Sequence, residues 1–468
     1  MIELIKKLTL IIIYYIAGNN SLFLYASTIS LYNIYLSCFN HITLKETFKK
    51  INYDYSKFKI LKYIAINIVI ICSLFIMLSI LISDSINTFL NIENTFLPYL
   101  IMSLSIITEP LIKILLEYLE SYKMPKLSNN LLKLYYIIEN ILLILISIIT
   151  INIIKQPISI AISLLYLSKI ISFIIILIII LKVLKKQNIK LDKTREETKI
   201  NYKYEIKEIL KNNSNKSIVI ITKKSYYYIS IIILYAILSK RYSYNIKYIE
   251  TTLSFIYLYG IYIMNFIKDI ILMITKKENK DNNVINSIYK VFQNSLTIAI
   301  ILGITSPLIC KILFNSSNNS VYFMMLSILL VFISLFDITY EYIKSKKIMY
   351  LTLIVGIIIK LILIIPLINS FYRMGYNLVY GDIISTIIGL LFGIIVNYIC
   401  IKINNKTEKT LENILVTLYE SILLCIILVL IQFIIPIKTD NYLRSLFTLA
   451  LYIFISIAFK KIKEKKRG

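Results

Sequence analysis

Charged residues lie inside the long apolar runs of this sequence, and their spacing could bring several of them onto one helix face. Glu109, Lys113 and Glu117 recur every four residues, and Asp337 and Glu341 have the same spacing. A charge at the centre of a bilayer costs about 2.5–3.5 kcal/mol on insertion scales, so it usually faces protein or water. These side chains could therefore bind a charged substrate or pair with charges on neighbouring helices.

Further charged residues fall in or beside apolar runs. They are Lys169, Lys223, Lys224, Lys268, Asp269, Lys311, Lys360 and Arg373. Lys side chains near helix ends often extend to the membrane surface, and this is the expectation for Lys268, Lys311 and Lys360. For the face that carries Glu109 and Lys113, two interpretations stay open: it lines a substrate cavity, or it forms ion pairs with a neighbouring helix.

The elements that carry these residues must be membrane helices. Of the 468 residues, 58% are hydrophobic and 17% are charged, whereas soluble proteins average roughly 45–50% and about 25%. The segment 8–44 has no Asp, Glu, Lys or Arg, and it exceeds the ~20 residues that a helix needs to cross a bilayer. A soluble enzyme and a disordered chain are therefore excluded, and the fold is predicted to be an all-α polytopic membrane protein.

The hydropathy pattern predicts about fourteen transmembrane helices. Pro110 lies in the fourth of them and is expected to kink it, because proline removes a backbone donor. The predicted spans are roughly 5–17, 22–44, 60–82, 96–116, 134–154, 157–181, 217–239, 249–274, 291–314, 321–343, 348–371, 379–401, 413–435 and 442–459.

Basic residues concentrate in alternate loops, which predicts the topology. The net charge is +26, and the positive-inside rule assigns the Lys-rich loops and both termini to the cytosol. Lys240, Arg241 and Lys247 are exceptions on the predicted outer side. Because the Lys residues lie between apolar runs, the expected partner is the lipid membrane and not a nucleic acid.

One long polar stretch divides the chain. Segment 182–216 holds eleven Lys and Arg residues and separates six predicted spans from eight. The predicted domains are an N-terminal six-helix bundle (1–184), a cytosolic linker (185–216), a C-terminal six-helix bundle (217–402), and a terminal helix pair with a basic tail (403–468). Two such bundles are often related by pseudo-symmetry around a central cavity that carries substrate.

No motif for catalysis or cofactor binding occurs. The sequence has no Gly-rich phosphate loop, no HExxH and no nucleophile elbow. Its five cysteines lie in apolar stretches without a CxxC pair, so neither a metal site nor a disulfide framework is expected. A non-enzymatic role without a cofactor remains, either transport or a scaffold within the membrane.

Several motifs resemble the eukaryotic Rft family, which is implicated in bringing dolichol-linked oligosaccharide to the lumenal side of the endoplasmic reticulum. The order of the motifs resembles the family over nearly the whole chain. The matching segments are Asn33-Ile34-Tyr35-Leu36, Lys45-Glu46-Thr47-Phe48-Lys49-Lys50, Glu109-Pro110 followed by Glu139, Phe336-Asp337-Ile338-Thr339-Tyr340-Glu341-Tyr342, and Met374-Gly375-Tyr376-Asn377.

The resemblance implies that the chain translocates, or helps to translocate, this lipid-linked oligosaccharide from the cytosolic to the lumenal leaflet for N-glycosylation. It implies partners among membrane lipids and glycosylation-pathway proteins. Lys465 and Lys466 near the C-terminus look like a dilysine retrieval signal for the endoplasmic reticulum. The candidates to line the substrate path are Lys45, Glu46, Lys49, Glu109, Lys113, Lys169, Lys224, Asp337, Glu341 and Arg373.

Three alternatives remain open. The chain could be a bacterial-type flippase for polysaccharide or lipid-linked sugar in the plasma membrane, since those proteins share the same layout. It could be a scaffold of a glycosylation complex that moves no lipid. It could also be an ion-coupled exporter of small molecules, with a compact site near Asp337 and Glu341.

Overall fold

The computed structural model describes most of the chain as helices, and its described part contains no strand. The described residues are 9–13, 16, 22–39, 42, 44, 47, 48, 51, 54–90, 94–122, 124–186, 220–222, 224, 225, 227–278, 284–314, 317–343, 346–404, 410–437, 439 and 441–467.

Among the described residues, twelve helices are long and apolar enough to cross a membrane. They match the third to fourteenth predicted spans, which confirms the prediction of an all-helical polytopic membrane protein. The second predicted span contains a helix of 15 residues, Phe23–Ser37. Much of the first predicted span lies outside the described residues.

The chain divides into two compact units, which are described separately. Unit 1 is Met1–Ser254 and unit 2 is Phe255–Gly468. The division falls inside one apolar span, Ile246–Lys276. The predicted bundles and the terminal pair stay predictions as domains, and nearly all of the predicted linker 185–216 lies outside the described residues.

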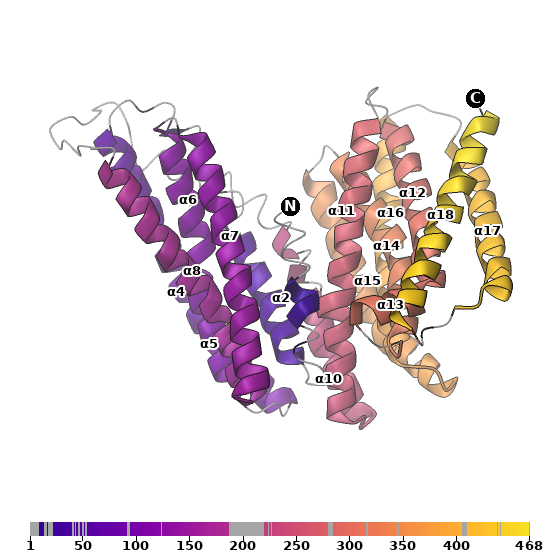
Figure 1. Ribbon diagram of the computed structural model, residues 1–468, viewed down its shortest axis with the longest axis horizontal. Helices are drawn as coiled ribbons and strands as arrows, with labels where there is room; N and C mark the ends of the chain where they lie inside the picture. Colours follow the sequence, from indigo (N-terminus) through magenta and orange to yellow (C-terminus); the bar gives the residue numbers. More distant parts are fainter. Residues whose placement is uncertain are drawn as a thin grey trace. The chain divides into compact units, whose positions relative to one another are not determined.

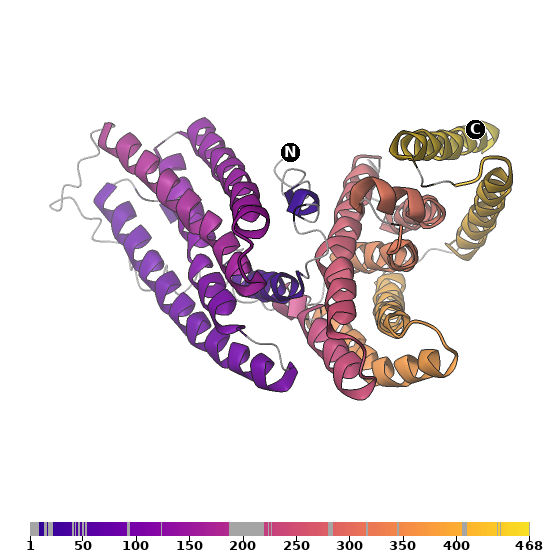
Figure 2. The same cartoon turned by 60° about the horizontal axis from the view of Figure 1, so that its bottom comes forward.

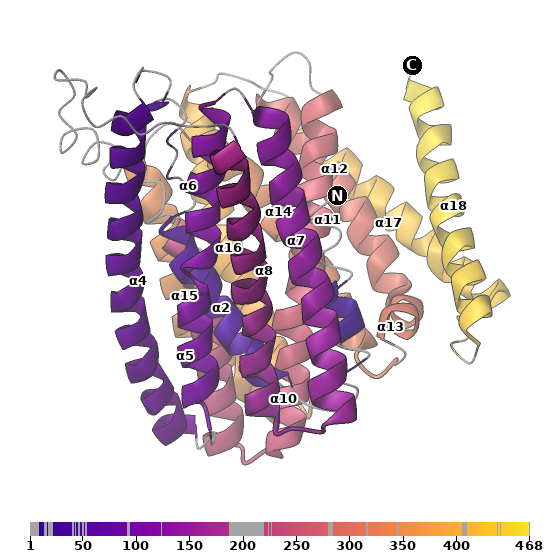
Figure 3. The same cartoon turned by 60° about the vertical axis from the view of Figure 1, so that its left-hand side comes forward.

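Five described membrane spans lie wholly within unit 1, besides shorter elements. In this unit α8 packs on both α5 and α7 (Figures 1 and 3). The last of the five spans, Ile220–Arg241, precedes α10. In chain order the elements are α2 (Phe23–Ser37), α4 (Asp54–Leu90), α5 (Phe96–Ser105), α6 (Thr108–Glu120), α7 (Pro125–Ser147), the π-helix η1 (Ile148–Ile153), α8 (Ile158–Lys186), the π-helix η2 (Ile237–Arg241) and α10 (Ile246–Ser254).

The fourth predicted span is interrupted at its proline, as predicted. Helix α5 ends at Ser105 and α6 begins at Thr108. Pro110 has no N–H to bond the carbonyl of Ile106, and its ring crowds that carbonyl, so the α-helix cannot continue through this turn. The interruption places Glu109 in the first turn of α6, where the helix dipole favours a carboxylate.

Apolar side chains from α6, α7 and α8 form a core within unit 1. Helix α4, in contrast, exposes large apolar side chains such as Leu74 and Met77, as expected for a helix that faces lipid. The buried residues of the core are Ile112, Leu116, Leu119, Leu131, Tyr135, Ile176 and Ile180.

Unit 2 is built around α14, which contacts α11, α12, α13 and α16 and is the most buried of its spans. Helices α17 and α18 lie at one edge of this unit (Figure 2), where they pack on α12 and α13. The elements are the π-helix η3 (Phe255–Gly260), α11 (Ile261–Glu278), α12 (Val284–Ile304), α13 (Ser306–Phe314), α14 (Ser320–Glu341), α15 (Lys346–Arg373), α16 (Val379–Asn404), α17 (Thr410–Ile434) and α18 (Tyr442–Arg467).

Glycines let α15 and α16 approach each other until their backbones touch. A Cβ atom at Gly389 would lie 2.6 Å from the carbonyl oxygen of Gly356, and one at Gly356 would lie 3.0 Å from that of Gly389. Small residues at such crossings give close van der Waals packing between membrane helices. One turn beyond Gly356, the side chain of Lys360 reaches Asp382 across the same crossing.

Replacing Gly389 by Ala is expected to destabilise unit 2 by about 1–3 kcal/mol, because the new methyl group meets a backbone atom that cannot rotate away. The matched control is Gly303→Ala, whose Cβ would lie 3.1 Å from the hydroxyl of Ser327, a side chain that can turn aside. Thermal unfolding of both variants in detergent checks this. Equal unfolding temperatures for the two variants would show that the crossing tolerates a wider separation.

Candidate functional site

A cluster of charged residues lies within the membrane helices of unit 1. The Lys169 ammonium on α8 is 2.6 Å from Glu139 Oε1 on α7 and 3.1 Å from Glu109 Oε1 on α6. The hydroxyl of Tyr32 on α2 donates to the same oxygen of Glu109 at 3.0 Å. The ammonium also lies 4.8 Å from the centre of the Tyr32 ring. We call these four residues the Lys169 cluster.

The Lys169 cluster is largely excluded from solvent by the helices that supply it. The exposed fractions of the Lys169, Glu109 and Glu139 side chains are 10%, 13% and 5%. Among the described residues, no group donates a hydrogen bond to the second carboxylate oxygen of Glu139. Since one ammonium holds two carboxylates on different helices, the cluster ties α6, α7 and α8 together electrostatically.

Tyrosine hydroxyls extend the polar network around the cluster. Tyr166 on α8 donates to Thr28 Oγ1 on α2 at 2.9 Å, and the hydroxyls of Tyr135 and Thr108 are 3.5 Å apart. Buried polar groups cost free energy unless they are hydrogen-bonded. These bonds therefore make a polar interior compatible with an otherwise apolar bundle.

Unit 2 contains a second buried ion pair. The Lys360 ammonium on α15 is 2.9 Å from Asp382 Oδ1 on α16, and both side chains are at most 3% exposed. The hydroxyl of Tyr257, in η3, donates to the other oxygen of Asp382. The prediction that Lys360 extends to the membrane surface is wrong, because the close α15–α16 crossing brings a carboxylate within reach of its ammonium.

Two more ion pairs join α11 to α14 in unit 2. Lys268 is 2.6 Å from Asp337, and each side chain is 13% exposed. Lys276 is 2.6 Å from Glu341, and both side chains are about half exposed. The i, i+4 spacing of Asp337 and Glu341 thus places both acids on the α14 face that α11 covers. Lys268 was expected to extend to the surface and instead pairs between helices.

The other predicted site residues lie on α6, on α15 and in the span Ile220–Arg241, or outside the described residues. Lys113 is half-buried on α6, and Arg373 is exposed at the end of α15. The Lys224 ammonium donates to the backbone carbonyl of Asn33, on α2, at 3.2 Å. Outside the described residues, or with undescribed side chains, are Lys45, Glu46, Lys49, Lys465 and Lys466.

Four residues of the buried clusters were not among the candidates from sequence: Tyr32, Tyr257, Asp382, and Glu139, which was named only in a segment that matches the resemblance. Tyr32 and Tyr257 belong to a chain with 38 tyrosines, so residue type alone could not select them. Asp382 carries a usable signal, since it is a lone acid at the start of an otherwise uncharged apolar run through Ile401. An acid in that position requires a cation on a neighbouring helix.

The chemistry available to these clusters is charge pairing. In the described part of the chain, no group of three His, Cys, Asp or Glu side chains could hold a metal ion. Ammonium and carboxylate groups at 2.6–3.1 Å can hold helices together. They can also exchange partners when a charged substrate or a helix movement changes their surroundings.

Comparisons with known proteins identify the fold. No protein-family model matches the chain, and the comparison with curated proteins finds no match. Among solved structures, the lipid II flippase MurJ in an inward closed conformation is 15% identical, covers 99% of both chains and gives a TM-score of 0.66. A multidrug resistance MATE family transporter of the MOP superfamily, in an inward-facing conformation, is 12% identical. The match covers 86% of this chain and 94% of the transporter chain, with a TM-score of 0.57.

Proposed function

We propose that this protein moves a lipid-linked sugar from one leaflet of a membrane to the other. The observation that carries the proposal is the likeness of the fold, over 99% of both chains, to a lipid II flippase. The match to the MATE transporter covers 86% of this chain, and its TM-score of 0.57 is lower than the 0.66 of the match to the flippase. A lipid-linked substrate is therefore favoured over a small soluble one.

Polar membrane interiors suit this task. Each hydroxyl of a sugar costs about 4–8 kcal/mol to transfer into an alkane without a hydrogen-bond partner. The buried charges and tyrosine hydroxyls of unit 1 provide hydrogen-bonding groups at membrane depth. Ammonium groups such as those of Lys113 and Lys224 would balance the charge of a diphosphate, while the lipid tail stays in the bilayer.

The substrate and compartment that we propose are a dolichol-linked oligosaccharide and the endoplasmic reticulum. The support is the resemblance of the Glu109-Pro110 and Phe336–Tyr342 segments to the Rft family, together with the Lys465-Lys466 pair. A tagged copy in that membrane is expected. A copy at the cell surface would instead favour the bacterial-type flippase for lipid-linked sugars.

A second candidate function is export of small molecules coupled to an ion. The MATE likeness favours it, and Asp337 and Glu341 would supply the acids. Both acids are, however, already within 2.6 Å of lysines on α11, so a coupling ion would have to displace an ammonium. The lipid-linked substrate therefore remains the preferred proposal.

Purified protein in vesicles is expected to transfer the headgroup of a fluorescent dolichyl diphosphate oligosaccharide, measured by its exposure to an added glycosidase. Lys113→Leu is expected to slow transfer at least about tenfold, because it removes a half-buried cation that we propose balances the charge of the diphosphate. Lys126→Leu, an exposed lysine at the start of α7, is the matched control. Vesicles that show no transfer above protein-free vesicles would favour the scaffold role.

A further inference from the structure

A cavity in unit 1 has the composition of a lipid-headgroup site. It has a volume of about 430 Å³ and lies where η1 ends and α8 begins, with Leu22 at the start of α2 closing one side. Ligand pockets of about 300–1,000 Å³ are usual for small molecules. The cavity lies at the turn between two candidate membrane spans, Pro125–Ile153 and Ile158–Lys185, and a turn between two spans is expected at the membrane surface.

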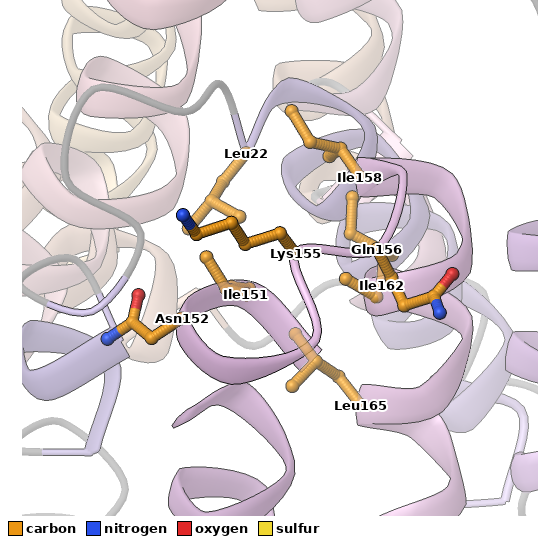
Figure 4. A pocket seen from close by; sticks show the side chains of 9 residues that line it. Leu22, Ile151, Asn152, Lys155, Gln156, Ile158, Ile162 and Leu165 are labelled. Atoms are coloured by element: carbon orange, nitrogen blue, oxygen red, sulfur yellow. The ribbon is translucent and has the colours of Figure 1, made fainter. Parts of the chain in front are cut away.

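The lining combines an apolar wall with three polar side chains. Lys155 extends between Leu22 and Ile151 with its ammonium on the side of Asn152, whereas the Gln156 amide points the other way (Figure 4). None of the three polar side chains has a hydrogen bond or an ion pair with another described residue. The apolar lining is completed by Ile158, Ala161, Ile162 and Leu165.

The backbone at Lys155 is held in a conformation that favours glycine. Its φ is 52°, in the left-handed region that costs roughly 1 kcal/mol for a side chain. Backbone bonds from Ile154 to Ile149 at 2.8 Å and from Gln156 to Thr150 at 2.9 Å fix this turn. A lysine in a place where glycine would fit better is consistent with a use for its ammonium, and π-helical turns such as η1 often occur at functional sites.

The charge of the lining indicates that the ligand is an anion. Of the nine described residues that line the cavity, Lys155 is the only charged one, so the site is cationic beside an apolar wall. We propose that this cavity binds the phosphate of an anionic lipid, with the Lys155 ammonium and the Asn152 amide on the phosphate oxygens and the lipid chain along the apolar wall. The site would bind such a lipid whether or not the chain moves lipid-linked sugars.

The test measures binding of dioctanoyl phosphatidic acid to the purified full chain in non-ionic detergent by native mass spectrometry. Lys155→Gly removes the charge and suits the left-handed backbone, so this variant is expected to fold as well as the parent. It should bind the lipid at least roughly tenfold more weakly, because a charge-assisted hydrogen bond is lost. Lys155→Arg should retain binding.

Lys247→Gln is the matched control, since Lys247 is also an exposed lysine of unit 1, and it should bind as the parent does. Farnesyl diphosphate as a second probe separates two sources: tighter binding than phosphatidic acid indicates a substrate lipid, and weaker binding indicates a membrane phospholipid. Equal affinities for parent and Lys155→Gly would overturn the proposal. So would equal affinity for dioctanoyl phosphatidylcholine, or for inorganic phosphate.

Discussion

Replacing Lys169 by Met is expected to destabilise unit 1 by about 3–5 kcal/mol, the cost of breaking a buried ion pair by removal of one partner. The substitution leaves Glu109 and Glu139 without the ammonium that contacts both at 3.1 and 2.6 Å. The measurement is the loss of the monodisperse peak on heating, followed with a fluorescent protein fusion because the chain has no Trp.

The control for Lys169→Met removes all three charges. Combining it with Glu109→Gln and Glu139→Gln leaves neutral side chains of similar shape, and replacing a whole buried ion cluster is often nearly neutral. We expect the triple variant to recover most of the lost stability, because the effects of substituting residues in contact do not add. A triple variant that is no more stable than Lys169→Met would show that packing, and not charge, accounts for the loss.

Replacing Lys360 by Met is expected to have a similarly large effect on unit 2. Asp382 would remain buried at 3% exposure with the Tyr257 hydroxyl as a donor but without a cation, so a loss of about 3–5 kcal/mol is expected. The double variant with Asp382→Asn should regain much of this stability. Thermal unfolding of both variants in the same detergent gives the comparison.

Lys276→Met is the matched control in unit 2. Lys276 also pairs with a carboxylate at 2.6 Å, but its side chain and that of Glu341 are 52% and 48% exposed. Exposed pairs contribute about 0–1 kcal/mol, so this variant should unfold close to the parent. If Lys276→Met and Lys360→Met lowered stability equally, burial would not be what makes the Lys360 pair important.

Glu109 on α6 forms an ion pair with Lys169 on α8. The sequence left two interpretations for its helix face, and the structure shows an ion pair between α6 and α8. A paired carboxylate can still face a hydrated path in another conformation of the protein. The role of Glu109 and Lys169 on such a path stays a prediction, which transport measurements on the stable triple variant would test.

The sequence by itself determined the helices. Hydropathy is a property of a contiguous segment, since a helix must bury its own backbone polar groups to cross a bilayer, and twelve predicted spans are present as described helices. The break at Pro110 was equally local, because proline disrupts the hydrogen bond to its own preceding turn.

Only the tertiary structure decided which charges meet. Lys169 pairs with acids 30 and 60 residues away, and Lys360 meets Asp382 because two glycines allow α15 and α16 to touch. The boundary between the two units, after Ser254, likewise falls inside one apolar span, where the hydropathy of the sequence marks no boundary. Which charges pair, and where the chain divides into units, both depend on how the helices pack. Helix packing in a bilayer is set by the shape of the helices and by contacts between residues that are distant in sequence.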